Sequence, residues 1–472
     1  MPYTGHMALK AMLERQRSAY LRDGAPSLAA RRESLGKLKH ALKARREDIV
    51  KAVNADFGHR SRQETSLFDV ASVIVTIDYM TRNLGRWMRP QRRGVGLIFI
   101  PGSNRVIYQP LGVVGIVSPW NYPFALALTP LATALAAGNR AMMKPSELAP
   151  ESAELMKRML GEAFDEEEVA VVTGDTSVGI EFSKLPFDHI LFTGSTAVGR
   201  SIMRAASDNL TPVTLELGGK SPVIVERGSP LAVAARRTAY GKLANAGQTC
   251  VAPDYALVAD TEVDAFVDAF RREVDRLYPD IASNSDYTSI INDRHLGRLR
   301  GLLDDARAKG ARVIEFGVNG KSPTHQRTML PAIVLDTTDA MSVVHEEIFG
   351  PILPVIPYNK LEDAVAYVNE RPRPLALYFF GPDGPGRQLV LDRTTSGGVA
   401  INETMMHYAQ DDLPFGGVGP SGMGAYHGRE GFKTLSHAKG VFAQAGMNST
   451  DAVRPPFGRL FEGVVRFLLR GR

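Results

Sequence analysis

The only cysteine of the chain, in Gly247-Gln248-Thr249-Cys250, is the first residue whose chemistry suggests a function. A thiolate is the strongest nucleophile among side chains at neutral pH. Gly247 lets the backbone turn tightly and approach a ligand closely. A free cysteine is also often a buried structural residue. This segment alone therefore leaves two interpretations open, a catalytic nucleophile and a structural thiol.

Two segments that follow predicted strands carry groups that could assist a nucleophile. Glu216, in an apolar strand that ends in Gly218-Gly219, would have its pKa raised toward the range of a useful base. Asn121 lies in Pro-Trp-Asn-Tyr-Pro, and its amide could donate to a developing oxyanion. The alternatives are a surface glutamate for Glu216 and, for Asn121, a turn residue that bonds its own backbone.

Two further strand ends suggest a phosphate-containing ligand. Lys144 and Glu147 are three residues apart, so both could reach one ribose. Gly194 and Ser195 lead into a predicted helix, and backbone N–H groups at a helix start attract phosphate. Each of these two signals is weak by itself.

The elements that must position these residues alternate between strand and helix. After helices in residues 8–56, strands and helices alternate over residues 106–217 and again over residues 256–401. Such alternation is typical of parallel sheets covered by helices. We expect the glycine-rich residues 416–428 to form a loop and residues 433–445 to form a final strand pair.

Length and composition fit a globular α/β protein of two or three units. The chain has 472 residues, and its net charge of +5 is small for that length, so we expect no nucleic-acid partner. A single cysteine excludes an internal disulfide and suggests a reducing compartment, from which we expect a cytoplasmic protein. His345-Glu346 lacks the second histidine of a zinc-protease motif, since Phe349 stands there, and we expect no metal.

The apolar stretch 111–137 is long enough to span a bilayer. Pro119, Pro123 and Pro130 interrupt it, and three prolines would break one continuous helix. A buried strand, a turn and a buried helix explain the stretch better.

Taken together, these segments closely resemble the aldehyde dehydrogenase superfamily. Six motifs occur in the family's order: Pro-Trp-Asn-Tyr-Pro, Lys-Pro-Ser-Glu, Phe-Thr-Gly-Ser-Thr, Glu-Leu-Gly-Gly-Lys-Ser-Pro, Gly-Gln-Thr-Cys and Glu-Glu-Ile-Phe-Gly-Pro. The short N-terminus and residues 414–428 look like the short, usually dimeric branch. Residues 406–414 are most similar to the bacterial coniferyl aldehyde dehydrogenases of that branch.

The resemblance implies a role for each motif. Cys250 attacks the aldehyde carbon to give a thiohemiacetal, and Asn121 holds the oxyanion with the Cys250 backbone N–H. Hydride transfer to the nicotinamide leaves a thioester, which water hydrolyses after activation by Glu216.

The implied cofactor is NAD, with NADP weaker. Lys144 and Glu147 would bind the adenosine ribose, Gly194 and Ser195 would lie under the pyrophosphate, and the remaining cofactor residues would be Trp120, Glu347 and Phe349. The implied substrate is a small aldehyde of the cinnamyl type, such as coniferyl aldehyde, in an aromatic pocket made by Tyr122, Phe124, Tyr408 and Phe415.

The implied fold has two Rossmann-like α/β domains and a small β oligomerisation element, in a homodimer. We expect an NAD-binding domain, a catalytic domain, the oligomerisation element and a C-terminal amphipathic helix, over residues 1–90 with 111–217, 218–425, 91–110 with 426–450, and 451–472, respectively. Dimer and tetramer stay open.

The C-terminal helix departs from the short soluble members of the family. Its apolar side chains recur at helical spacing with charged ones opposite, and they are Phe457, Leu460, Phe461, Val464, Val465 and Leu468. It could dock on its own or a partner subunit, or contact a membrane surface. Short-branch enzymes of fatty aldehydes carry C-terminal helices, so medium or long aliphatic aldehydes are the alternative substrates.

Two other functions compete with this interpretation. A relative that releases its thioester to coenzyme A would typically lack the glutamate at position 216, so Glu216 argues against it. A catalytically silent structural or binding protein belongs to a different class, and reaction of Cys250 with a thiol-selective probe would separate it from an enzyme.

Overall fold

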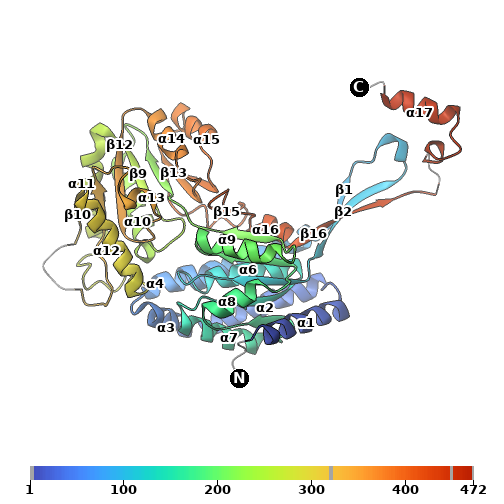
Figure 1. Cartoon of the computed structure of the whole chain (residues 1–472), viewed down its shortest axis with the longest axis horizontal. Coiled ribbons are helices and arrows are strands. Elements are labelled where there is room, and N and C mark those ends of the chain that lie inside the picture. The colour runs from blue at the N-terminus through green and yellow to red at the C-terminus, as the bar shows by residue number, and fades with distance from the viewer. Residues whose placement is uncertain (1–4, 318–322, 447–449, 470–472) are drawn as a thin grey trace.

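The computed structural model describes residues 5–317, 323–446 and 450–469. Its strands form three sheets, of six, seven and three strands. Each of the two larger sheets is the centre of a lobe, and the smallest sheet forms an arm that projects from one lobe (Figure 1). The α/β class expected from the sequence is confirmed. The division into cofactor and catalytic domains stays a prediction.

The six-stranded sheet has the order β15-β7-β6-β3-β4-β5. Five strands are parallel, and β15 (Gly422–Met423) adds antiparallel to β7. The parallel strands are β3 (Val113–Val117), β4 (Arg140–Lys144), β5 (Val169–Val171), β6 (His189–Thr193) and β7 (Val213–Glu216). Thus a residue pair near the end of the predicted catalytic range, 422–423, completes the first sheet.

Side chains of successive residues in this sheet pack on opposite faces, as the pleat of a strand requires. In β4, Ala141 and Met143 pack on one face and Met142 on the other. The first face is covered by α2 (Leu28–Ala44), α3 (Arg46–Phe57), α5 (Ser72–Trp87), α6 (Ala125–Ala137) and α7 (Pro150–Ala163). The second face is covered by α1 (His6–Asp23), α8 (Thr176–Ser183) and α9 (Thr196–Ser207).

The stretch 111–137 forms strand β3, a turn and helix α6, as predicted. Every residue of α6 is buried, including Pro130. In the parts of the chain that the structure describes, no helix is both long and apolar enough to cross a bilayer. Between α3 and α5, the chain forms a short helix, α4 (Arg62–Glu64), and the π-helix η1 (Thr65–Ala71).

The seven-stranded sheet has the order β10-β11-β12-β9-β8-β13-β14, with only the edge strand β10 antiparallel to its neighbour. Its strands are β8 (Pro222–Val225), β9 (Tyr255–Ala259), β10 (Arg312–Glu315), β11 (Ala332–Leu335), β12 (Ile352–Tyr358), β13 (Ala376–Phe380) and β14 (Gly398–Ile401). The helices around it are α10 (Leu231–Leu243), α11 (Val263–Leu277), α12 (Asp293–Ala308), α13 (Ser342–His345), α14 (Leu361–Asn369) and α15 (Pro385–Arg393). Four short 3-10 turns occur in different parts of the described chain: η2 (Leu97–Phe99), η3 (Ala244–Gly247), η4 (Asp260–Glu262) and η5 (Thr450–Val453).

The arm consists of β1 (Gln91–Arg93), β2 (Ser103–Pro110) and β16 (Ser436–Ala443), all antiparallel. The predicted strand pair within residues 433–445 is wrong. Residues up to Thr434 belong to helix α16 (Gly428–Thr434), and β16 is a single strand that pairs with β2 along its whole length. The pairing of this segment with the excursion near residues 90–110 is as expected.

The C-terminal helix α17 (Arg459–Leu469) lies beyond the arm (Figure 1). None of its described residues is buried, and Leu460, Phe467 and Leu468 are more than half exposed. Residues 470–472 lie outside the described part of the chain. Docking of this helix on its own lobes, one of the alternatives above, is not seen in the described residues.

Because no described residue of α17 is fully buried in its own chain, removal of residues 455–472 should leave the free energy of unfolding of a single chain nearly unchanged. Chemical denaturation of the full-length and truncated proteins measures this. Leu131→Ala is the contrasting control, since Leu131 is completely buried in α6 and its truncation should cost about 2–5 kcal/mol. A concentration-dependent loss of stability on truncation would instead show that α17 packs against a second copy.

Candidate active site

A cavity of about 230 Å³ lies where residues from both lobes meet. Eight of the predicted site residues line it together, from both sides: Trp120, Asn121, Gly194, Ser195, Glu216, Cys250, Glu347 and Phe349. The sequence separates them by up to 229 positions, yet the fold brings them to one place. Two residues that sequence analysis missed, His295 and Arg298, also line the cavity.

Parallel pairing explains why the first lobe contributes its residues here. Strands β3, β6 and β7 run in the same direction, so their carboxyl ends lie at one edge of the sheet, where α/β proteins place binding sites. Thr193 and Glu216 are direct partners in the register. Gly194 N–H donates to the Glu216 carbonyl at 3.0 Å, which extends the ladder to the cavity wall.

Cys250 follows a turn of left-handed backbone. Asn245 and Ala246 both have φ of 51°, and Gly247 has φ of 75°. A Cβ at Gly247 would overlap the carbonyl oxygen of Gly350, so glycine is required there for both conformation and space. The turn delivers the partly buried Cys250 to the cavity.

Asn121 is almost completely buried and its side chain reaches the segment before the cysteine. Asn121 Nδ2 donates to the carbonyl of Gln248 at 3.1 Å. A side-chain amide carries two N–H donors, and the second has no partner among the described residues. The geometry therefore leaves one N–H available to a ligand beside Cys250.

Glu216 is 3% exposed, and neither of its carboxylate oxygens has a hydrogen-bond partner in the described part of the chain. Burial raises the pKa of Glu216 well above its usual range, because the charged form loses its hydration. A carboxylate with a raised pKa is a stronger base than an ordinary one. A carboxylate that lines a cavity and has no hydrogen-bond partner is free to exchange a proton with a bound ligand.

The Cys250 thiol is also a weaker acid than usual. Burial raises its pKa to about 12, with further contributions from the Glu347 and Glu216 carboxylates. Burial and Asp254 raise the pKa of Glu347 to about 7, against a backbone hydrogen bond from Gly219 that lowers it. At neutral pH the thiol is therefore protonated in this structure, and a base must remove its proton before it can act as a nucleophile.

Lys144 and Glu147 do not line the cavity but lie at the end of β4. Lys144 Nζ is 3.4 Å from Glu147 Oε2, and burial lowers the pKa of Lys144. Thr176 Oγ1 donates to Glu147 Oε1 at 3.1 Å. Ser195 caps the N-terminus of α9 and lines the cavity together with Gly194.

The four predicted pocket aromatics do not behave alike, and none lines the cavity itself. Tyr122 is buried, and its hydroxyl lies 2.8 Å from Thr249 Oγ1. Phe124 is completely buried in the core of the first lobe. Tyr408 and Phe415 pack edge to face, with ring centroids 4.9 Å apart.

Tyr408 and Phe415 belong to a larger aromatic cluster that the sequence did not reveal. His427 packs against Phe415, Tyr408 and Tyr426, at centroid distances of 5.0, 4.9 and 4.6 Å. Cys250 and Tyr408 contact the same hydrophobic cluster, in which Phe415 and Tyr426 are buried. Tyr426-His427 lies near the end of the glycine-rich segment 416–428, which was the one local signal for it.

Comparison with known proteins agrees with this geometry. The sequence model described as Aldehyde dehydrogenase family matches residues 2–441. A Pseudomonas aeruginosa protein described as a probable coniferyl aldehyde dehydrogenase is 52% identical, over 97% of this chain and 95% of its own. A coniferyl aldehyde dehydrogenase of Pseudomonas sp. is 47% identical, over 98% and 97%. A Staphylococcus aureus AldH structure in a substrate-bound state is 36% identical, with a TM-score of 0.92, over 98% of this chain and 99% of that one.

The raised pKa of Cys250 predicts how fast the thiol is alkylated. Only the thiolate reacts, so the rate with iodoacetamide should rise about tenfold per pH unit above neutrality and continue past pH 9, where an ordinary thiol with a pKa of about 8.5 levels off. Intact mass measures the reaction without ambiguity, because the chain has one cysteine.

Glu347→Gln should increase the alkylation rate at any given pH in this range, because the Glu347 carboxylate raises the pKa of the thiol. Glu346→Gln, at the exposed neighbouring position, is the matched control and should leave the rate unchanged. A plateau below about pH 9 in the unmodified protein would contradict the assignment of a raised pKa.

Proposed function

The chain belongs to the aldehyde dehydrogenase family, and from this premise we propose that Cys250, Asn121 and Glu216 oxidise an aldehyde to a carboxylic acid. The single observation that supports this assignment is the shared cavity. The cavity is lined by the only thiol, that of Cys250, by the buried amide of Asn121 with its second N–H free, and by the Glu216 carboxylate, which has no partner in the described part of the chain. Few other reactions need these three groups together.

Enzymes of this family use NAD(P), and the residues present fit such a cofactor. Gly194 and Ser195 expose the start of α9 to the cavity, where N–H groups favour a pyrophosphate. Lys144 and Glu147 offer a cation and an acceptor for ribose hydroxyls. Glu347, Phe349 and Trp120 line the cavity near Cys250 and would hold the nicotinamide end.

In the first step, Cys250 Sγ attacks the carbonyl carbon and the C=O electron pair moves to the oxygen. The thiol proton passes to a nearby carboxylate, for which Glu216 is suited by its raised pKa. The free N–H of Asn121 and the Cys250 N–H donate to the oxyanion, which stabilises it in a site with little water. The product is a thiohemiacetal on Cys250.

When bound, NAD(P) supplies the hydride acceptor that takes the hydrogen from the former aldehyde carbon. That carbon then remains attached to Sγ as a thioester. Glu216 first releases the thiol proton to solvent and then takes a proton from a water molecule while the water oxygen attacks the acyl carbon. The C–S bond breaks, the carboxylic acid leaves, and Cys250 recovers its proton.

The roles of Cys250 and Glu216 can be separated kinetically. Cys250→Ala should bind NAD but form no NADH from aldehyde. Glu216→Gln should still form about one NADH per site, in a slower burst because the thiol has lost its assigned base, and should then turn over about 10²–10⁴-fold more slowly than the unmodified enzyme because deacylation has also lost its base. Stopped-flow absorbance measures both phases, and intact mass should show the acyl adduct on Cys250.

Glu226→Gln is the matched control for this experiment. Glu226 also follows a buried strand end, β8, and has a raised pKa, but it does not line the cavity. Wild-type steady-state turnover in Glu216→Gln would exclude Glu216 as the deacylation base and favour release to coenzyme A. If the wild-type protein formed no NADH from any aldehyde, a catalytically silent binding protein would be favoured.

We propose a cinnamyl-type aldehyde, such as coniferyl aldehyde, as the substrate. The names of the two Pseudomonas relatives support this class. The aromatic rings of Tyr408, Phe415, Tyr426 and His427 pack together on the same hydrophobic core that Cys250 contacts, and they would form the wall against which a substrate ring packs. Medium or long aliphatic aldehydes are the second candidates, because the exposed apolar α17 resembles the helices of fatty-aldehyde enzymes.

Coniferaldehyde should therefore have a higher kcat/KM than acetaldehyde, since burial of a ring contributes about 1–3 kcal/mol more than burial of a methyl group. Initial rates of NADH formation with coniferaldehyde, decanal and acetaldehyde measure the preference. A clear advantage of decanal over coniferaldehyde would favour the aliphatic alternative.

We also propose a preference for NAD over NADP. Glu147 would face the 2′-phosphate of NADP, and two like charges about 4 Å apart in water repel by about 1 kcal/mol, or roughly fivefold in Kd. Titration by cofactor fluorescence should show tighter binding of the reduced NAD form, and Glu147→Gln should narrow the difference. Equal Kd values in the unmodified protein would contradict the role of Glu147.

For the assembly, we propose a homodimer in which the arm contributes to the interface. The outer strands β1 and β16 each have one edge without a neighbour in the described chain, and unpaired edges favour association. The apolar side of α17 would be covered by the partner subunit or would contact a membrane surface. The removal of residues 455–472 described above tests whether α17 packs against the partner subunit.

A further inference from the structure

Arg60 is a charged residue with no exposed side-chain surface. Burial of a charge is unfavourable unless its groups find partners, so its contacts identify what it does. Nη1 donates to the carbonyl of Asn121 at 2.8 Å, and Nη2 lies 3.6 Å from Asp69 Oδ2. The guanidinium also packs over the rings of Phe57 and Tyr122, at 4.7 and 4.9 Å.

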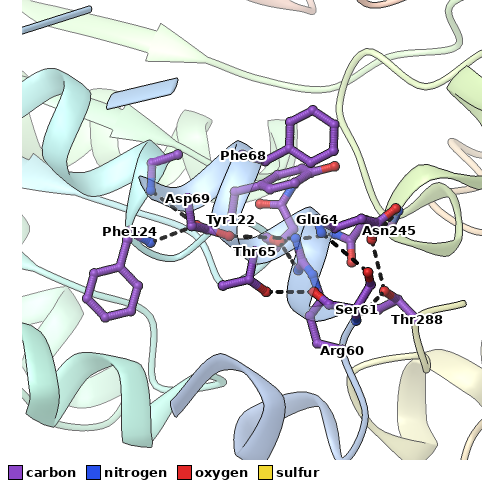
Figure 2. A network of polar contacts seen from close by, with 12 residues as sticks. Arg60, Ser61, Glu64, Thr65, Phe68, Asp69, Tyr122, Phe124, Asn245 and Thr288 are labelled. Atoms are coloured by element: carbon purple, nitrogen blue, oxygen red, sulfur yellow. Dashed lines mark hydrogen bonds and ion pairs between the residues drawn. The ribbon is translucent and has the colours of Figure 1, made fainter. Parts of the chain in front are cut away.

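Asp69 extends this contact to the other side of the Asn121 turn. Its Oδ1 accepts the backbone N–H groups of Phe124 and Ala125 at 3.1 and 3.2 Å, at the first turn of α6. Arg60 thus holds the carbonyl of Asn121, and Asp69 holds the backbone of the residues that follow the Asn121 turn. Figure 2 shows Asp69 beside Phe124.

The cysteine segment is attached to the same point through Asn245. Asn245 Nδ2 donates to the Asn121 carbonyl at 3.0 Å and to the Gln248 carbonyl at 3.1 Å. Its backbone N–H is held by both oxygens of Glu64, at 3.0 and 3.1 Å, and Thr288 donates to the same carboxylate. Figure 2 shows Glu64 between Asn245 and Thr288, on the helix that follows Arg60.

The Asn121 carbonyl therefore accepts two hydrogen bonds, one from Arg60 and one from Asn245. The Gln248 carbonyl also accepts two, one from Asn245 and one from the Asn121 side chain. The amide that would hold the oxyanion and the segment two residues before the nucleophile form one hydrogen-bonded unit. No group of this unit besides Asn121 is required to touch the substrate.

We propose that Arg60 is a positioning residue that acts through Asn121, by fixing the peptide from which the oxyanion-binding amide projects. This inference rests on the proposed function, since it requires that Asn121 stabilises an oxyanion. A reacting group displaced by about 1 Å can lose about 10²-fold in rate. Lysine keeps the charge of Arg60 but cannot hold the Asn121 carbonyl and Asp69 with the same planar fork.

A double-mutant cycle tests the proposal: wild type, Arg60→Lys, Asn121→Ala and the double variant, with the rate constant of NADH formation in the first turnover, here called the burst rate, as the readout. Asn121→Ala should lower this rate about 10²–10³-fold, and Arg60→Lys about 10–100-fold. In the Asn121→Ala background, Arg60→Lys should lower it less than about twofold, because residues that act through one group are not additive. The aldehyde concentration for half-saturation should change less than about threefold in Arg60→Lys, as expected for a loss specific to the transition state.

Arg31→Lys is the matched control. Arg31 is also buried and also donates to backbone carbonyls, but those of Ala136 and Ala137 at the C-terminal end of α6. It should lower stability without changing the burst rate. Asn245→Gly, which tolerates the left-handed backbone and removes only the bridging amide, is a second variant that should lower the burst rate in an Asn121-dependent way.

The outcomes separate the inference from the function beneath it. If Arg60→Lys and Asn245→Gly lowered the burst rate as much in the Asn121→Ala background as in the wild-type background, the positioning role would be overturned. The proposed function would remain intact. An unchanged burst rate in Asn121→Ala would overturn both. A similar loss in Arg31→Lys would show that general weakening of α6, and not the contact to Asn121, lowers the rate.

Discussion

The side-chain amide of Asn245 joins the two segments on which the candidate site depends. It bonds the carbonyl of Asn121, 124 positions earlier in the chain, and that of Gln248, three positions later. The first segment leaves a strand end of one lobe, and the second leads to Cys250 in the other. This joint fixes the distance between the amide and the thiol more firmly than packing of the two lobes alone could, because a hydrogen bond has a narrow range of length and angle.

Burial is the dominant electrostatic influence on the groups around this joint. It is the largest cause of the raised pKa values of Cys250, Glu216 and Glu347. In the site, the equilibrium of each group is therefore shifted toward its uncharged form relative to water. A proton that leaves the thiol has acceptors of raised basicity close by, and an oxyanion formed there is stabilised by dipoles more strongly than it would be in water.

The sequence predicted the parts of this arrangement that have local signals. Alternating strands and helices predicted both parallel sheets. Turns at strand ends predicted part of the lining of the cavity, and the family motifs added Trp120, Glu347 and Phe349. It could not give contacts between distant segments of ordinary composition. The partner of β16 is β2, more than 320 positions earlier. Nothing in the local sequence marks Arg60 and Asp69 as buried, although the side chains of both are. Phe124 was likewise predicted to line the substrate pocket, and only tertiary packing places it, together with Tyr122, in the core.

The same contacts explain why the glycine positions of two motifs are not interchangeable with other residues. A Cβ at Gly218 would overlap the Glu347 carboxylate, and one at Gly247 would overlap the Gly350 carbonyl. Residues 347–350 thus press against the turn after Glu216 and the turn before Cys250 at once. Three motifs that are separate in the sequence form one packed unit in space, so a side chain added in either turn would displace the segment that also carries Phe349. The spacing of the base, the thiol and the ring that would face the cofactor is set jointly by these close approaches.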